Sequence, residues 1–317
     1  MSVMPDAVYA YGGVLLGSGL PSVCYAGGKW YWCDPTNGTT NGDSETPATA
    51  TTSLATAYGK CRDGYNDGVF LIGKATAASL TAALAWSKNY CHLIGLSADL
   101  PGVGQRCRVT GSATADLTVL VTVSGSGCVF KNIQFFNGAD ADVDSGAVVV
   151  SGNRNYFENC FVVGMGHATP AARAGSYSMN VSGSENVIVR TAIGTDSVVR
   201  AAANAELIVT GKNNSFYGCE IRSNSVTAGK FLVRVDSSVD DMRSVRFDNC
   251  LFYNYSTNWA TGITDAIDIN EVSTYWLILS GNCQFVGCTG VADVTTHIYG
   301  SGAAPNAGMF LSTNPTT

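Results

Sequence analysis

The sequence predicts an all-β fold: a single right-handed parallel β-helix, or solenoid, with a short N-terminal capping helix and extended arms at both ends. Six segments of the chain align with one another, and aligned positions recur every 27 to 33 residues. Only 13% of the 317 residues are charged, and 36 are glycine, a composition that favours strands and turns over long helices. A β-sandwich also has regularly spaced strands, but it gives no reason for specific columns to repeat.

The apolar columns of the repeat predict its core. The segments start at Val119, Ala147, Ser178, Glu206, Leu232 and Ala266. One column reads Phe130, Phe157, Ile188, Phe216 and Phe247, and three residues later another reads Ile133, Cys160, Thr191, Cys219, Cys250 and Cys283. If each segment is one coil, every column becomes a stack at a spacing of about 4.8 Å. We therefore expect core stacks, in which the cysteines act as small, reduced, buried hydrophobes.

A third column predicts a bend between two sheets. It stands just before the cysteine column and reads Asn132, Asn159, Arg190, Gly218, Asn249 and Asn282. Asparagine and glycine tolerate the left-handed backbone that a sharp bend needs. We expect Asn132, Asn159, Asn249 and Asn282 to form a bend stack whose side-chain amides pair as a ladder.

The remaining segments divide the chain into four parts. Residues 1–28 are apolar and glycine-rich and contain no Lys or Arg, which predicts an arm rather than a secretory signal. Residues 29–68 hold an entry strand, a turn-rich loop and a short helix with Ser53 as its N-cap, which covers the first coil. The β-helix is expected over residues 69–290, and residues 291–317 form a C-terminal cap and tail.

The outward positions of the first strand of each segment show little chemistry. They read Thr122, Val149, Asn180, Ile208, Arg234 and Asp268. Arg234 and Asp268 are expected to form a surface ion pair, and this face lacks the second acid that glycoside cleavage requires. The sequence therefore predicts no catalytic, metal or cofactor site, and predicts that the protein is not an enzyme.

The partners expected from composition are few. A net charge of −6 argues against a nucleic-acid surface, and no apolar run is long enough for a membrane span. Tyr253, Tyr255 and Trp259 lie together after a strand end and form the candidate contact surface, since interfaces favour Tyr and Trp.

Two stretches of the sequence resemble known proteins. The entry WYWCDPTNGTTNGDSETPATA, followed by a short helix and DGVFLIG, resembles pectin-lyase-like parallel β-helix proteins. The stretch LAWSKNYCHLIGLSADLPGVGQRCRV resembles virion-associated β-helix proteins of tailed bacteriophages. Together the resemblance covers roughly residues 29–290 and implies a protein of the virus particle.

The function expected from this resemblance is structural. The protein is expected to be a capsid decoration, or cement, protein that braces neighbouring shell subunits from the capsid exterior after assembly in the host cytoplasm. Its expected partners are the major capsid protein and further copies of itself in a homotrimer. A tail spike or receptor-binding β-helix is the alternative, and a secreted polysaccharide lyase or hydrolase is the second alternative.

Overall fold

The computed structural model describes most of the chain in side-chain detail. The described residues are 28–97, 107–112, 115–225, 230–236, 243–255, 263–270, 275–293 and 298–300, together with the backbone of 10–11 and 14–15. Within these residues, no helix is long and apolar enough to cross a membrane.

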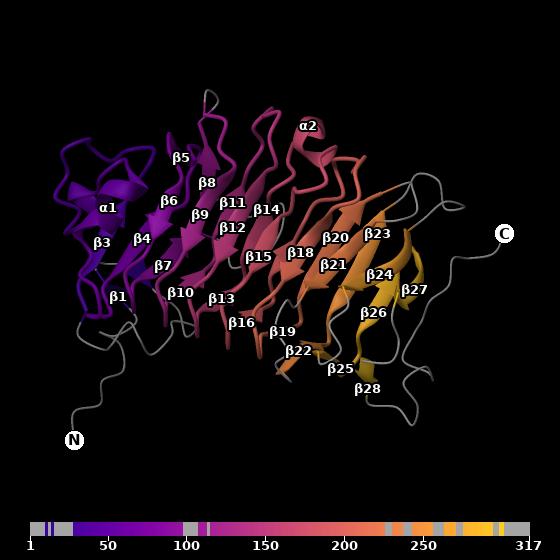
Figure 1. Ribbon diagram of the computed structural model, residues 1–317. Helices are drawn as coiled ribbons and strands as arrows, with labels where there is room; N and C mark the ends of the chain where they lie inside the picture. Colours follow the sequence, from indigo (N-terminus) through magenta and orange to yellow (C-terminus); the bar gives the residue numbers. More distant parts are fainter. Residues whose placement is uncertain are drawn as a thin grey trace, which may run out of the picture.

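The chain winds into a stack of coils whose strands form three parallel sheets, as Figure 1 shows. Each coil contributes one strand to each of the three sheets, here called sheets 1, 2 and 3. A strand therefore pairs with the equivalent strands of the neighbouring coils. This connectivity confirms the predicted all-β right-handed parallel β-helix.

The strands of the described residues fall into the three sheets as follows. Sheet 1 comprises β3 (Trp30–Cys33), β4 (Gly68–Ile72), β7 (His92–Leu96), β10 (Val129–Lys131), β13 (Tyr156–Glu158), β16 (Val187–Val189), β19 (Ser215–Tyr217), β22 (Arg243–Asp248), β25 (Tyr275–Ser280) and β28 (Ile298–Gly300). Sheet 2 comprises β5 (Ala78–Leu80), β8 (Arg108–Gly111), β11 (Gln134–Phe136), β14 (Phe161–Val163), β17 (Ala192–Ile193), β20 (Glu220–Asn224), β23 (Leu251–Tyr255) and β26 (Gln284–Val286). Sheet 3 comprises β6 (Leu84–Trp86), β9 (Val119–Val123), β12 (Gly146–Val150), β15 (Met179–Val181), β18 (Ala205–Val209), β21 (Phe231–Asp236), β24 (Ile263–Asn270) and β27 (Cys288–Ala292).

The remaining elements do not belong to the three parallel sheets. A short antiparallel pair joins β1 (Ala10–Tyr11) to β2 (Val14–Leu15), and a 3-10 turn spans Pro47–Thr49. Helix α1 (Leu54–Lys60) begins where expected, because the Ser53 hydroxyl accepts a hydrogen bond from the Thr56 amide at its N-cap. Its buried residues Leu54, Ala57 and Tyr58 face the first coil. Helix α2 (Ala168–Ala171) lies in a loop between sheets 2 and 3.

The core columns lie in the coil register that the repeat predicted. Phe130 pairs with Phe157, and Phe216 pairs with Phe247, with ring centroids 4.5 and 4.7 Å apart. Ile188 occupies the same column between the two Phe pairs. The cysteines of the neighbouring column, Cys160, Cys219, Cys250 and Cys283, are all buried and free of disulfides.

The bend between sheets 1 and 2 corrects one predicted residue. Asn132, Asn159 and Asn249 have positive φ angles of 59°, 50° and 53°, which is the left-handed backbone that the bend requires. In the last complete coil Gly281 takes this conformation with a φ of 64°, and Asn282 does not. One extra residue stands there, because Asp248 pairs with Ser280 whereas Leu251 pairs with Gln284.

At the predicted bend the Asn159 side-chain amide donates to Asn132 Oδ1 at 3.5 Å, and a longer row of asparagines lies at a different turn. Asn155, Asn186 and Asn214 are buried at the turn between sheets 3 and 1. Each backbone amide along this row donates to the Asn side chain of the next coil: Asn155 to Asn186 at 2.8 Å, and Asn186 to Asn214 at 2.9 Å. The sequence displays this column too, two residues before the Phe column.

The parallel stacking extends beyond the predicted limits of the helix. β3 pairs with β4, so the stack begins at Trp30, inside the segment expected to precede the first coil. At the other end, β27 and β28 continue sheets 3 and 1 past Gly290. The segment expected to form a C-terminal tail therefore contributes to strands β27 and β28.

Replacing Phe216 by Ala is expected to destabilise the protein by about 3–5 kcal/mol, because the fully buried ring stacks on Phe247 and its loss leaves a cavity. Urea denaturation followed by circular dichroism measures this change. Ser215→Ala, on the outward face of the same strand, is the control and should stay close to the parent protein. Equal midpoints for the two variants would contradict the assignment of Phe216 to the core.

Candidate active site on sheet 3

One outward column of sheet 3 carries the candidate site. Its members pair in register from coil to coil: Thr122, Val149, Asn180, Ile208, Arg234 and Asp268. All are partly exposed. The column is uncharged over its first four members and ends in an arginine and an aspartate.

Arg234 and Asp268 form the ion pair that the sequence predicted. The Arg234 Nε atom lies 2.7 Å from Asp268 Oδ2, and the two side chains are 27% and 15% exposed. Since both groups are largely shielded from water, this contact holds the guanidinium against the carboxylate more firmly than a fully solvated pair would.

Asp293 supplies a second carboxyl group next to Asp268. Strands β24 and β27 pair Ile267 with Ala292, so Asp293 follows one position later, beside Asp268. The Ile269 amide donates a hydrogen bond of 2.8 Å to Asp293 Oδ1 and fixes its side chain.

The surroundings of Asp268 make its carboxyl less acidic. Burial is the main cause that raises the pKa of Asp268, and the charge of Asp293 raises it further, while Arg234 lowers it. Burial and the charge of Asp293 also raise the pKa of the nearby Asp265. Asp268 therefore binds a proton more readily than a solvated aspartate does.

This arrangement offers an acid, a base and a cation in one place. The protonated carboxyl can donate a proton, the ionised carboxylate can activate water or attack an electrophile, and the guanidinium can stabilise developing negative charge. Among the described residues, no three His, Cys, Asp or Glu side chains are grouped so as to hold a metal ion.

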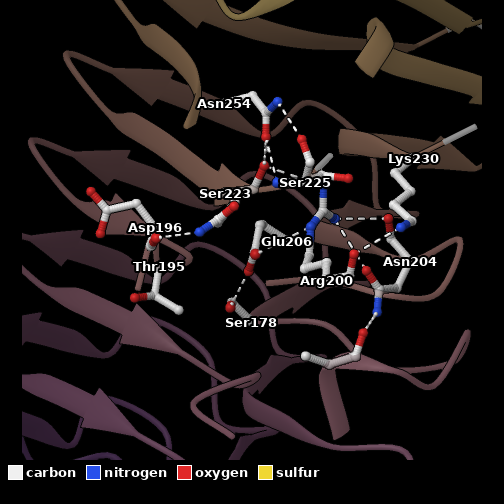
Figure 2. Close-up of polar contacts among 12 residues, drawn as sticks. Ser178, Thr195, Asp196, Arg200, Asn204, Glu206, Ser223, Ser225, Lys230 and Asn254 are labelled. Atoms are coloured by element: carbon white, nitrogen blue, oxygen red, sulfur yellow. Dashed lines mark hydrogen bonds and ion pairs between the residues drawn. The ribbon is translucent and has the colours of Figure 1, made fainter. Parts of the chain in front are cut away.

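A buried polar network surrounds Arg200 and Glu206, as Figure 2 shows. Arg200 and Glu206 are both almost fully buried, with Arg200 Nε 3.7 Å from Glu206 Oε1. The Ser178 hydroxyl donates to Glu206 Oε2 at 2.5 Å. Lys230 Nζ donates to the Arg200 carbonyl at 2.7 Å.

The network ties the loop of residues 194–204 to two strands of sheet 3. Arg200 Nη1 donates to the carbonyl of Asn204, just before β18, at 2.9 Å. The same atom donates to the carbonyl of Phe231, the first residue of β21, at 2.8 Å. Because β21 also carries Arg234, Arg200 helps to position the candidate site.

The predicted contact surface lies on the outer face of a different sheet. Tyr253 and Tyr255 belong to β23 of sheet 2, where Tyr253 pairs with Arg222, and Tyr255 is 38% exposed. Trp259 lies outside the described residues. The role of these residues in contacting a partner stays a prediction.

Comparisons with known proteins identify the fold. No family model and no curated protein matches the sequence. A pectin methylesterase, PemA from Erwinia chrysanthemi, matches with a TM-score of 0.56 and 12% identity over 85% of this chain and 80% of that one. A pectin methylesterase in complex with a hexasaccharide matches with a TM-score of 0.54 and 12% identity over 84% and 80%.

The chain has the pectin-lyase-like parallel β-helix fold. At 12% identity this likeness shows the fold alone. It confirms the resemblance to pectin-lyase-like proteins and does not show the finer resemblance to phage virion proteins.

The expectation that the protein is not an enzyme is corrected. The two solved structures described above, which share its fold, are enzymes, so the fold itself does not argue against catalysis. The sequence argument against catalysis also rested on a missing second acid, and Asp293 places a second carboxyl group beside Asp268. It was missed because residues 291–317 were assigned to a tail rather than to the last coil.

The pH dependence of stability tests the buried network. Burial raises the pKa of Glu206 to about 7, although the charge of Arg200 and the hydrogen bond from Ser178 oppose the rise. Between the ordinary pKa of 4.5 and this value, the folded state binds more protons than the unfolded state, so stability falls as pH rises. The loss across this window is about 3 kcal/mol.

Glu206→Gln is expected to remove the fall in stability with rising pH that Glu206 causes, because glutamine does not titrate. Urea denaturation at a series of pH values from 4 to 8 measures it, with Glu185→Gln, a partly exposed glutamate, as the matched control. A pH profile of Glu206→Gln that follows the parent protein would show that Glu206 does not titrate in this range.

Proposed function

We propose that the protein hydrolyses an ester on a polysaccharide, with Asp268 and Asp293 as the acid–base pair and Arg234 as the stabilising cation. The observation that carries the proposal is the placement of Asp293 beside Asp268, which is paired with the Arg234 guanidinium on the outer face of sheet 3. Two proteins of the same fold are pectin methylesterases, and one of them is in complex with a hexasaccharide.

The groups gathered at this site are those that ester hydrolysis uses. They are a carboxyl pair for proton transfer and a guanidinium that stabilises negative charge on the carbonyl oxygen. In an ester hydrolysis the ionised carboxylate activates water for attack on the carbonyl carbon, and the protonated carboxyl gives its proton to the leaving alcohol.

Measuring release of methanol and acetate from a panel of esterified polysaccharides tests the proposal. Asp268→Asn and Asp293→Asn should each lower the rate by about a hundredfold or more, because each removes one half of the acid–base pair. Arg154→Ala, which breaks an exposed ion pair elsewhere on the helix, is the control and should keep the parent rate. Ester release that survives both Asp variants would overturn the proposal.

A location on a virus particle is the second candidate, and the cysteines favour it. All ten cysteines in the described part of the chain are buried and free, which fits a protein that folds in a reducing cytoplasm. A tail spike that acts on a surface polysaccharide would combine this property with the candidate site. Capsid decoration, with the major capsid protein and a homotrimer as partners on the capsid exterior, is the other particle role.

Copy number separates these two roles. Quantitative mass spectrometry of purified particles should find a decoration protein on the order of hundreds of copies, since it would occupy repeated shell sites. A tail spike should be present in a few tens of copies or fewer, and light scattering on the purified protein tests the trimer. Complete absence from particles would remove both particle roles and leave the enzymatic proposal untouched.

A further inference from the structure

Three cysteines occupy the same position on three successive coils. Glu220 pairs with Leu251, and Leu251 pairs with Gln284, so the preceding residues Cys219, Cys250 and Cys283 lie side by side. Each is 1% exposed and carries a free thiol. Cys160 belongs to the same column, but its neighbour on the next coil is Thr191 and not a cysteine. The Ala192 amide, one residue after Thr191, donates to the Cys160 carbonyl and sets this register.

The spacing of this row suits a disulfide. Neighbouring parallel strands lie about 4.8 Å apart, and disulfide-bonded cysteines have Cα atoms about 4.4–6.8 Å apart. Residues on both sides of these cysteines pair in one register, Tyr217 with Asp248 and Glu220 with Leu251, whereas the extra residue of the last coil precedes Cys283. The thiols of Cys219 and Cys250 each donate to a backbone carbonyl of the preceding coil, to Ile188 and to Phe216, at 3.4 Å. The two side chains therefore point the same way from neighbouring coils.

We infer that Cys219 and Cys250 form a latent disulfide site, which stays reduced in a reducing compartment and closes into a bond that joins two coils in an oxidising one. The site is independent of the ester-hydrolysing function proposed above. The reaction is exchange with a small-molecule disulfide such as oxidised glutathione. One thiolate attacks the small disulfide and releases one small thiol, and the second cysteine then displaces the other small thiol and closes the Cys219–Cys250 bond.

The surroundings of the thiols predict slow closure in the folded protein. The neighbouring Cys219 thiol and burial together raise the pKa of Cys250, so the reactive thiolate is scarce while the coil is closed. Exchange requires the coil to open, or takes place while the chain folds. The bond should therefore form readily when the protein is refolded with oxidised glutathione, and more slowly when the folded protein is incubated with it.

Peptide mapping of the full chain tests the inference. The protein is refolded with oxidised or with reduced glutathione, its remaining thiols are alkylated, and digests are searched by mass spectrometry for a Cys219–Cys250 cross-link. We expect this cross-link only in the oxidised sample, with a thermal midpoint raised by about 5 °C or more. Reduction with dithiothreitol should reverse both changes.

Two variants make the result specific. Cys250→Ser should abolish the cross-link, because Cys219 and Cys283 then stand two coils apart, beyond the reach of a disulfide. Cys160→Ser, which removes a cysteine of the same column without a thiol on the next coil, should leave the cross-link unchanged. The absence of a cross-link after oxidative refolding, or a bond from Cys250 to Cys283 in its place, would overturn the inference. A cross-link that leaves the thermal midpoint unchanged would contradict the expectation that the bond stabilises the two coils it joins.

Discussion

Backbone hydrogen bonds between successive parallel coils set the position of nearly every side chain in this protein. They hold each coil about 4.8 Å from the next, and they keep equivalent residues in register along the helix. Because the register is shared by all three sheets, a residue chosen for one coil always faces the residues at the same position on its two neighbours. Each column of equivalent residues therefore forms one stack of side chains, and the type of side chain in the column decides how neighbouring coils interact there.

The same spacing gives different results for different side chains. Phenylalanines one coil apart stack face to face, as Phe130 and Phe157 do at 4.5 Å. Two thiols at that separation stand on neighbouring coils and face the same way, as those of Cys219 and Cys250 do. Two carboxyl groups at that separation act on each other electrostatically, and the charge of Asp293 helps to raise the pKa of Asp268. Core, latent cross-link and candidate active site thus follow from one geometric constraint.

The features that repeat from coil to coil could be predicted from the sequence, and the irregular features of single coils could not. The Phe and Cys columns and the Arg234–Asp268 pair could be read from fixed offsets between segments. The offsets fail in the last coil, where one extra residue moves the bend from Asn282 to Gly281. Asp293 lies beyond that irregularity, so its place beside Asp268 depends on the pairing of β27, which no earlier segment indicates. Arg200 sits in a loop without an equivalent in the other coils, and its contact with Glu206 could not be predicted from a repeat.

The rigidity of the coil fixes where the charged groups of the candidate site stand. The Ile269 amide donates to Asp293, and the guanidinium of Arg234 lies 2.7 Å from Asp268. Arg200 ties the start of β21, the strand that carries Arg234, to the buried network. Because burial and the charge of Asp293 both raise the pKa of Asp268, this carboxyl binds a proton more readily than a solvated aspartate does, and proton transfer is what the proposed ester hydrolysis requires.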